Sequence, residues 1–272
     1  MKPVISILGC GWLGFPLAKH LVSLGFTVKG STTTPAKLQP IQHNRILPFL
    51  IECDPEVRGD RVSEFFQSDI VFLNIPFKRN LEDPKFYYQQ IQSVANWIAQ
   101  SPVKFVIFAS STSIYPQSLK LADEHISFVP DNQRSQVLFE AEQLLMQAQG
   151  FDTTIIRFAG LFGGERVGKT SFKDVVEDSD QPMNVIHLDD CIEIVTQIIK
   201  RDIRNEIFNA CADKHPTRKE FYMRRILKHR EEMPIFKDAQ SKHQRIVSND
   251  QLKQVLNYQL KYPDPLNFPE LL

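Results

Sequence analysis

The sequence predicts a doubly wound α/β fold, in which helices cover both faces of a parallel sheet and a smaller C-terminal lobe follows. Three observations support this prediction. Short apolar runs alternate with segments of helical periodicity over the first 160 residues, and a glycine-rich turn joins the first apolar run to the first helix. After about residue 160 the alternation weakens into loops rich in Gly, Asp and Lys. Apolar strands separated by helices are typical of parallel sheets that are buried on both faces.

The apolar runs and helical segments place the expected elements. We expect strands at residues 4–8, 26–28, 70–73, 105–108, 154–158 and 206–209. We expect helices at residues 12–24, 87–99, 136–149 and 191–199, with Gly150 as the C-terminal stop of the third. The main domain is expected to comprise residues 1–160 with 184–210, and the small lobe residues 161–183 and 211–272. Ligands of such sheets bind beyond the carboxyl ends of the strands, where the lobe would hold a substrate.

Composition excludes several classes of protein. A chain of 272 residues, 42% of them hydrophobic, suits one large domain or a domain with a smaller lobe. The 32 Lys and Arg residues balance the 32 Asp and Glu residues, so we expect neither nucleic acid nor a membrane as partner. No apolar run reaches the roughly 18 residues that a membrane helix needs. Four cysteines without CxxC spacing favour reduced thiols and a cytoplasmic location.

Residues 9–14 read Gly-Cys-Gly-Trp-Leu-Gly, which fits the pattern GxGxxG between an apolar strand and a helix. Gly9 permits the tight turn, Gly11 lets the backbone approach a pyrophosphate, and Gly14 allows close packing of helix on strand. The free main-chain N–H groups at the helix start, including those of Trp12 and Leu13, would point at the anion. The turn therefore predicts a dinucleotide-binding site, with an ordinary glycine-rich turn as the alternative.

The end of the second strand bears on which dinucleotide binds. NAD-selective sites place Asp or Glu there to bind the ribose 2′-hydroxyl, and residues 29–37 contain no carboxylate. Hydroxyl groups and a cation suit a 2′-phosphate instead. We therefore expect NADP rather than NAD, with the 2′-phosphate bound by Ser31, Thr32, Thr33 and Lys37.

A second phosphate-binding pattern competes with the glycine turn. Residues 163–170 fit GxxxxGK[ST], the P-loop pattern, and follow an expected strand. A working P-loop needs a substantial helix directly after its Thr, and here only residues 171–177 precede an interruption at 178–182. We interpret the segment as a loop whose Arg166 and Lys169 contact anionic parts of a ligand, with a nucleotide triphosphatase as the alternative.

Serines crowd the end of the strand at 105–108, in the run Ser110-Ser111-Thr112-Ser113-Ile114-Tyr115-Pro116. With this run the chain resembles the extended short-chain dehydrogenase/reductases, the group of nucleotide-sugar epimerases and dehydratases built on a Rossmann sheet. The resemblance covers most of the chain and rests on the glycine turn, Asn74-Ile75-Pro76, the serine run, Arg157 to Gly163, and Asn184 to Asp190.

The resemblance implies roles for several of these residues. Ser111, four positions before Tyr115, would help to bind the reacting oxygen. Ser110 and the segment Asn74-Ile75-Pro76 would lie near the cofactor ribose and nicotinamide. Arg157, at the end of a strand, would hold a substrate anion or form a structural ion pair.

One departure from the family pattern bears on catalysis. The resembling enzymes carry YxxxK, whose Tyr is the acid/base and whose Lys lowers the pKa of that Tyr. The matching positions here run from Arg134 to Leu138, and no Tyr lies between Tyr115 and Tyr222. An arginine cannot act as a general base at useful pH. The acid/base candidates that remain are Tyr115, Asp123, Glu124 and His187. The alternative is a substrate that needs little proton transfer, with the cofactor supplying the hydride chemistry.

Together these observations predict an NADP-binding epimerase, dehydratase or reductase with a non-standard active site. Its substrate would be a small carbonyl, alcohol or nucleotide sugar, and the protein would be a monomer or homodimer. The alternative is a catalytically silent NADP(H)-binding sensor or regulatory protein.

Two further clusters have simpler structural interpretations. The run His187-Leu188-Asp189-Asp190 has metal-ligand residues, but a helix follows it and Asp189 or Asp190 suits the N-cap, so no metal site is expected. The basic run at 218–230 carries Phe221, Ile226 and Leu227 at helical spacing. This spacing favours a solvated helix face over a nucleic-acid patch.

Overall fold

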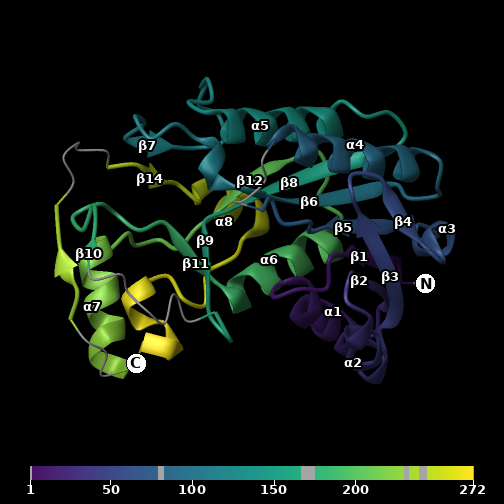
Figure 1. The fold of residues 1–272 in the computed structure, drawn as a ribbon, viewed down its shortest axis with the longest axis horizontal. Helices are drawn as coiled ribbons and strands as arrows, with labels where there is room; N and C mark the ends of the chain where they lie inside the picture. Colours follow the sequence, from purple (N-terminus) through teal and green to yellow (C-terminus); the bar gives the residue numbers. More distant parts are fainter. Residues whose placement is uncertain (1, 79–82, 167–174, 230–232, 239–243, 272) are drawn as a thin grey trace.

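The computed structural model describes residues 2–78, 83–166, 175–229, 233–238 and 244–271 (Figure 1). Its centre is an eight-stranded sheet in the order β12-β8-β6-β5-β1-β2-β3-β4. These strands are β1 (Val4–Leu8), β2 (Thr27–Thr32), β3 (Leu47–Cys53), β4 (Val57–Gly59), β5 (Ile70–Leu73), β6 (Phe105–Ser111), β8 (Asp152–Phe158) and β12 (Ile207–Ala210). Neighbouring strands run parallel except β3 and β4, which are antiparallel. The predicted α/β fold with a parallel sheet is confirmed.

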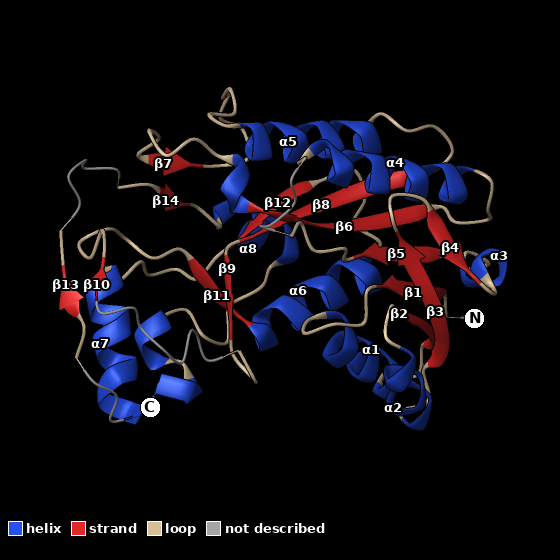
Figure 2. Ribbon diagram, viewed as in Figure 1, coloured by secondary structure: helices blue, strands red, loops and turns tan. Residues whose placement is uncertain are grey.

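Helices cover both faces of the sheet (Figure 2). One face carries α4 (Lys85–Ala99) and α5 (Gln133–Met146), and the other carries α1 (Gly14–Ser23), α2 (Leu38–His43) and α6 (Leu188–Arg201). Two short helices complete the main layers, α3 (Val62–Phe65) beside β3 and β4, and α8 (Asp250–Leu256) beside α6 and β12. Because helices shield both faces, β5 is buried along its whole length. No helix within the described ranges combines the length and the apolar character that a membrane crossing requires.

Most predicted elements are present, although several ends differ. β1 and β5 have the predicted bounds, and α5 begins at Gln133 rather than at residue 136. The earlier start has a local cause, since the Asn132 side chain accepts the Ser135 N–H at 3.0 Å and Ser135 reciprocates in a capping box. The helix ends at Met146, so Gly150 is not its stop signal. Gly150 lies in the turn before β8 with φ +97°.

A smaller group of elements lies at the left of Figure 1, and all of its members except β7 follow β8 in the chain. It contains α7 (Arg218–His229) and the short strands β7 (Leu121–Ala122), β9 (Gly160–Phe162), β10 (Val175–Val176), β11 (Val185–His187), β13 (Ile235–Phe236) and β14 (Ile246–Val247). Phe162, Val185, Phe221 and Phe268 form an apolar cluster here, separate from the main core. This second cluster fits the expected small lobe, whose exact boundaries stay a prediction.

The basic run at 218–230 forms α7, as its apolar spacing predicts. Phe221 and Ile226 are buried, whereas Arg224 and Leu227 are exposed. Arg225 departs from the expected solvated face, because this residue is 1% exposed. The expectation that the basic residues lie in solvent is therefore wrong for Arg225.

Candidate functional site

The strand order of the sheet reverses between β1 and β5, which is where ligands bind in open parallel sheets. The loop after β1 is the glycine turn, and the loop after β5 begins at Asn74. The Asn74 main-chain N–H donates to the Leu8 carbonyl at 3.0 Å, and its side-chain amide donates to the Gly9 carbonyl at 3.0 Å. Asn74 therefore links the loop after β5 to the glycine turn after β1.

Two of the three glycines in the turn are required by the packing of the protein itself. Gly9 has φ +110°, and a Cβ there would lie 2.5 Å from the Asn74 carbonyl oxygen. A Cβ on Gly14 would lie 2.2 Å from the Gly9 carbonyl oxygen, so a side chain there would push α1 away from β1. These contacts account for Gly9 and Gly14 without a ligand.

Gly11 is different, because no contact within the described residues requires a glycine there. Its φ is not positive, and a Cβ at this position would have no atom within 4 Å. The position is exposed at the start of α1, beside Trp12 and Leu13, where the first N–H groups of a helix lack partners in the helix. An anion fits this space, since helix N-termini attract negative charge and a larger residue at Gly11 would fill the approach.

Ser31, which the sequence predicts at a 2′-phosphate, instead binds the main chain of the glycine turn. Its hydroxyl oxygen accepts the Gly9 N–H at 2.9 Å, and its carbonyl accepts the Cys10 N–H at 2.8 Å. Ser31 is 2% exposed, so its side chain faces the protein rather than a ligand beyond β2. Cys10 packs against Gly30, and burial raises the pKa of its thiol to about 12, which disfavours a reactive thiolate.

The other residues expected at the 2′-phosphate differ in their exposure to solvent. Thr32 is buried, and its hydroxyl accepts the Thr34 N–H at 3.1 Å. Thr33 is exposed directly after β2, and Lys37 is exposed at the end of the short 3-10 helix η1 (Pro35–Lys37). Of the predicted group, Thr33 and Lys37 are the members whose side chains reach solvent.

The segment Ile75-Pro76-Phe77-Lys78 after β5 is held from both neighbouring helices. The Tyr87 hydroxyl on α4 donates to the Ile75 carbonyl at 3.2 Å, and the Tyr87 and Phe77 rings stack at 4.4 Å. Arg134 on α5 donates to the carbonyls of residues 77 and 78 at 3.3 and 3.0 Å, and its guanidinium lies 4.0 Å from the Phe77 ring centroid. Arg134 is therefore fixed against this segment, and its match to the Tyr of the family motif stays a prediction.

Ser111 lies at the end of β6, and among the described residues its hydroxyl accepts a hydrogen bond but donates none. Its oxygen accepts the Ser113 N–H at 3.1 Å and caps the 3-10 helix η2 (Thr112–Ile114). Because the oxygen accepts from the backbone, the O–H is left to donate to another acceptor. Ser110 is buried and donates to Glu142 at 2.5 Å. Alternate residues of a strand point to opposite faces, so the Ser111 side chain points away from Glu142, and its contact with a substrate stays a prediction.

A buried polar cluster lies behind the serine run. Arg157 on β8 and Glu142 on α5 are 3% and 0% exposed, and Arg157 Nη2 donates to Glu142 Oε2 at 2.6 Å. Arg157 Nη1 donates to the Tyr115 hydroxyl at 2.7 Å, and that hydroxyl donates to Asn209 Oδ1 at 3.0 Å. We call Ser110, Tyr115, Glu142, Arg157 and Asn209 the Glu142 cluster. It joins β6, β8, β12 and α5 through side chains.

The Glu142 cluster changes the interpretation of two predicted site residues. Tyr115 is 1% exposed, and burial raises its pKa even though the Arg157 guanidinium opposes the change. A hydroxyl enclosed in this way does not reach a substrate, so its surroundings do not favour the predicted catalytic role. For Arg157 the structure shows the ion pair that the sequence left open as the alternative to a substrate contact.

His187 is the N-cap of α6, which corrects the expectation that Asp189 or Asp190 takes this place. The His187 Nδ1 atom accepts the Asp189 N–H at 3.1 Å, and the helix begins at Leu188. Asp190 is instead buried and accepts the Tyr258 hydroxyl at 2.6 Å. Among the described residues, no three His, Cys, Asp or Glu side chains are grouped so as to hold a metal ion.

Asp123 and Glu124, the other acid/base candidates, follow β7 and bind main-chain amides. Asp123 accepts the His125 N–H at 2.9 Å. Glu124 accepts the Asn209 N–H at 2.6 Å, and burial raises the pKa of its carboxyl group. A raised pKa occurs both in catalytic acids and in structural networks, so Glu124 stays a candidate.

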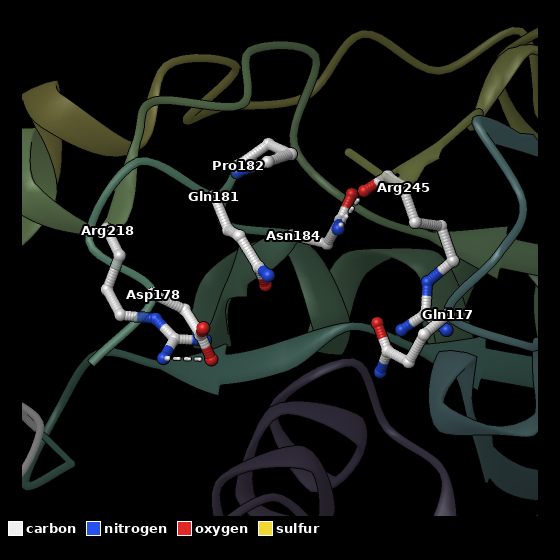
Figure 3. A pocket seen from close by; sticks show the side chains of 7 residues that line it. All are labelled: Gln117, Asp178, Gln181, Pro182, Asn184, Arg218 and Arg245. Atoms are coloured by element: carbon white, nitrogen blue, oxygen red, sulfur yellow. Dashed lines mark hydrogen bonds and ion pairs between the residues drawn. The ribbon is translucent and has the colours of Figure 1, made fainter. Parts of the chain in front are cut away.

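A polar pocket of about 380 Å³ lies between the end of β6 and the small lobe (Figure 3). It is lined by Gln117, Asp178, Gln181, Pro182, Asn184, Arg218 and Arg245. Arg218 and Asp178 face each other at one end, 3.9 Å apart, and Arg245 lies beside Gln117 at the other. Guanidinium groups and side-chain amides suit a polar, negatively charged small molecule.

Sequence reasoning assigns none of these residues to a pocket, because they come from separate segments and carry no motif. Arg218 belongs to the run expected on the surface. Arg245 shows a signal that only the structure provides, since its Nε atom is buried without a hydrogen-bond partner in the described part of the chain. Burial also lowers the pKa of its guanidinium group.

Arg166, predicted to contact a ligand, reaches the glycine turn. Its guanidinium lies 4.8 Å from the Trp12 ring centroid, and the Trp12 indole N–H donates to the Gly163 carbonyl at 3.1 Å. The loop after β9 therefore lies against the start of α1. Residues 167–170 of the P-loop-like pattern, which include Lys169, lie outside the described residues.

Solved structures of low sequence identity share this fold. UDP-glucose 4-epimerase from Thermotoga maritima, solved with UDP-glucose, has a TM-score of 0.79 and 16% identity, covering 95% of this chain and 94% of that chain. A short-chain dehydrogenase/reductase superfamily protein from Agrobacterium tumefaciens, solved with NAD, has a TM-score of 0.76 and 15% identity, covering 95% and 93%. A conserved protein of unknown function from Silicibacter pomeroyi has a TM-score of 0.77 and 18% identity, covering 97% and 95%. The fold is that of the short-chain dehydrogenase/reductases and NAD-dependent epimerases, as the motifs predict.

Sequence comparison gives the particular family within this class. Protein YeeZ of Escherichia coli strain K12 is 30% identical over 271 residues, which cover 97% of this chain and 98% of that protein. The YeeZ protein of Escherichia coli O157:H7 gives the same values. The chain therefore belongs to the YeeZ family. No family model matches the chain.

Proposed function

We propose that the protein is an NADP-dependent enzyme of the epimerase, dehydratase or reductase kind, acting on a small polar substrate. The observation that carries this proposal is Gly11, which faces open space at the start of α1 where the strand order reverses. The fold supports it, since one similar structure was solved with NAD and another with UDP-glucose. Gly11 and the main-chain N–H groups of Trp12 and Leu13 would hold the pyrophosphate.

The end of β2 supports NADP over NAD. Residues 29–37 contain no carboxylate to bind a free ribose 2′-hydroxyl, and Thr33 and Lys37 extend into solvent beyond the strand. A hydroxyl and an ammonium group suit a 2′-phosphate. When bound, a nicotinamide dinucleotide supplies the hydride chemistry, and the protein supplies binding, orientation and electrostatics.

The polar pocket supports a charged substrate. Arg218 and Arg245 lie at its two ends, with Gln181 and Asn184 between them (Figure 3). A carbonyl or alcohol compound bearing phosphate or carboxylate groups, such as a nucleotide sugar, matches this lining better than an apolar compound does.

Ser111 would polarise the reacting oxygen of the substrate. It is the serine at the end of β6 whose hydroxyl hydrogen is left to donate, and a donor aimed at developing negative charge lowers the reaction barrier. No Tyr or Lys lies on α5, so an acid/base step would use another group. Glu124, whose pKa is raised by burial, is the carboxyl that fits this task best.

A binding titration tests the cofactor. The parent protein and Gly11→Glu would be titrated with NADPH and NADH by isothermal calorimetry. We expect the variant to lose at least about 100-fold in NADPH affinity, because a carboxylate would occupy the space for the pyrophosphate. Equal melting temperatures would show that the variant is folded. If Gly11→Glu binds NADPH as firmly as the parent does, the proposal is wrong.

A second candidate function is a catalytically silent NADP(H)-binding sensor. It is favoured by Arg134, a fixed cation where the family motif has its acid/base Tyr. NADPH oxidation would be measured with a panel of nucleotide sugars and small carbonyl compounds. An enzyme should turn over at least one of them, and Ser111→Ala should lower that rate about 100-fold without changing NADPH affinity. Tight NADPH binding without turnover would favour the sensor.

A further inference from the structure

Contacts beyond the glycine turn connect it to a distant segment of the chain. The Trp12 indole N–H donates to the carbonyl of Gly163, 151 positions later. Gly163 and Arg166 form two main-chain hydrogen bonds of 3.0 Å with each other, which close a tight turn. The Arg166 guanidinium covers the same indole. The side chain next to Gly11 is therefore held by the turn at 163–166.

Glu270, close to the C-terminus, fixes this turn from the other side. Its carboxylate accepts the Gly164 N–H at 2.8 Å and lies 3.2 Å from His187 Nε2. Because His187 Nδ1 accepts the Asp189 N–H, the ring hydrogen is on Nε2 and is donated to Glu270. Gly163 has φ +106°, and a Cβ there would lie 2.6 Å from His187 Nε2. The turn therefore packs directly on the ring that Glu270 holds.

The surroundings of this contact make it rigid. The side chains of His187 and Glu270 are 4% and 18% exposed. The rings of Tyr262 and Phe268 pack on His187 with centroids 4.2 and 5.2 Å from it. Hydrogen bonds to an ionised carboxylate are stronger than neutral ones, and partial burial strengthens them further. We call Trp12, Gly163, Gly164, His187 and Glu270 the tail clamp.

We propose that Glu270 is a positioning residue of the cofactor site. Through the tail clamp it fixes the Trp12 indole, and with it the direction of the main-chain N–H groups at the start of α1. Gly11 has no side chain to restrict this segment, so the indole contact supplies the restriction. The inference rests on the proposed function, because it assigns a dinucleotide pyrophosphate to those N–H groups.

Tryptophan emission and NADPH affinity test the inference together. The chain has two tryptophans, so Trp97→Phe leaves Trp12 as the reporter. In this background, Glu270→Ala should change Trp12 emission without cofactor and weaken NADPH binding about five- to tenfold. Glu270→Gln keeps an oxygen that accepts the Gly164 N–H, and should retain most of the affinity. Glu140→Ala removes an exposed carboxylate on α5 and is the matched control, with no expected change.

A double-mutant cycle identifies the route of the effect. Trp12→Phe keeps an aromatic ring but removes the N–H that Gly163 accepts. It should weaken NADPH binding about as much as Glu270→Ala does. If Glu270 acts through Trp12, the double variant should be no weaker than either single variant, because coupled residues are not additive.

The outcomes separate this inference from the proposed function. A parent that binds neither NADPH nor NADH overturns the proposed function, and this inference with it. A parent that binds NADPH, with a folded Glu270→Ala variant of equal affinity, overturns the inference alone. Additive losses in the cycle also overturn it, since Glu270 would then act by another route.

Discussion

The glycine turn and the Glu142 cluster lie at the same edge of the sheet, yet their polar groups have different surroundings. In the cluster, Ser110 and Arg157 both bond to Glu142 inside the protein. At the turn, Gly11 faces open space beside the first N–H groups of α1. Polar groups that bond to one another stabilise the fold, whereas groups open at a helix N-terminus are available to a ligand. A polar residue at a strand end therefore indicates binding only where the protein does not already use it.

The largest expected effect is a loss of stability when the Glu142 cluster loses its carboxylate. Glu142→Ala leaves the Arg157 guanidinium buried without its carboxylate, which should lower the free energy of unfolding by about 3–5 kcal/mol. Denaturant unfolding measures this loss. Glu140→Ala, two positions earlier and exposed, should change it by no more than about 0.5 kcal/mol. A loss of less than about 1 kcal/mol for Glu142→Ala would mean that the cluster does not stabilise the fold as described.

The glycines sharpen the same comparison within one turn. Gly14→Ala should lower the free energy of unfolding by about 1–3 kcal/mol, because its Cβ meets a main-chain oxygen. Gly11→Ala should leave the free energy of unfolding within about 0.5 kcal/mol of the parent, because its Cβ contacts no other atom of the described protein. It should weaken NADPH binding at least about tenfold, because the Cβ occupies the space proposed for the pyrophosphate. Thermal unfolding and calorimetric titration of both variants give the two numbers. A Gly11→Ala protein that is destabilised but binds NADPH normally would show that Gly11 serves the packing of the protein and not the cofactor.

Substitution of Tyr115 should mainly lower stability, whereas substitution of Ser111 should mainly lower turnover. Tyr115→Phe removes the hydroxyl that links Arg157 to Asn209, and should lower the free energy of unfolding by about 1–2 kcal/mol without affecting NADPH affinity. Ser111→Ala should lower turnover about 100-fold, while the lost cap of η2 should lower the free energy of unfolding by no more than about 1 kcal/mol. Denaturant unfolding and a turnover assay of each variant check the pair. If Tyr115→Phe abolishes turnover in a protein of unchanged stability, its predicted catalytic role is restored.

The parts of the fold that sequence predicts are those with a local signal. β1 and β5 are continuous apolar runs, and the glycine turn has its own pattern of three glycines. β3 has no such signal, because Pro48 lies within it and prolines are rare inside strands. The expected start of α5 is late because the signal there is the capping box of Asn132, which precedes the apolar periodicity.

The site is less predictable because its contacts join distant positions. Tyr115 follows a serine run that resembles a catalytic motif, but its hydroxyl bonds to Asn209, 94 positions away. His187 and Glu270 are 83 positions apart. Local patterns report what a residue is able to do, and only the fold decides whether another residue has already taken its hydrogen bonds.

The smallest effect is expected at Lys37, an exposed cation beyond β2. Lys37→Ala should weaken NADPH binding about three- to fivefold and leave NADH binding unchanged, because an exposed charge pair contributes up to about 1 kcal/mol. Calorimetric titrations with the two cofactors measure the ratio, and added salt should reduce the difference. Lys19→Ala, an exposed lysine on α1, is the control for net charge. Equal losses for both cofactors would place Lys37 away from the 2′-phosphate. Ser31, whose hydroxyl is already bonded to Gly9, would show by contrast a loss of stability on substitution rather than a change of cofactor preference.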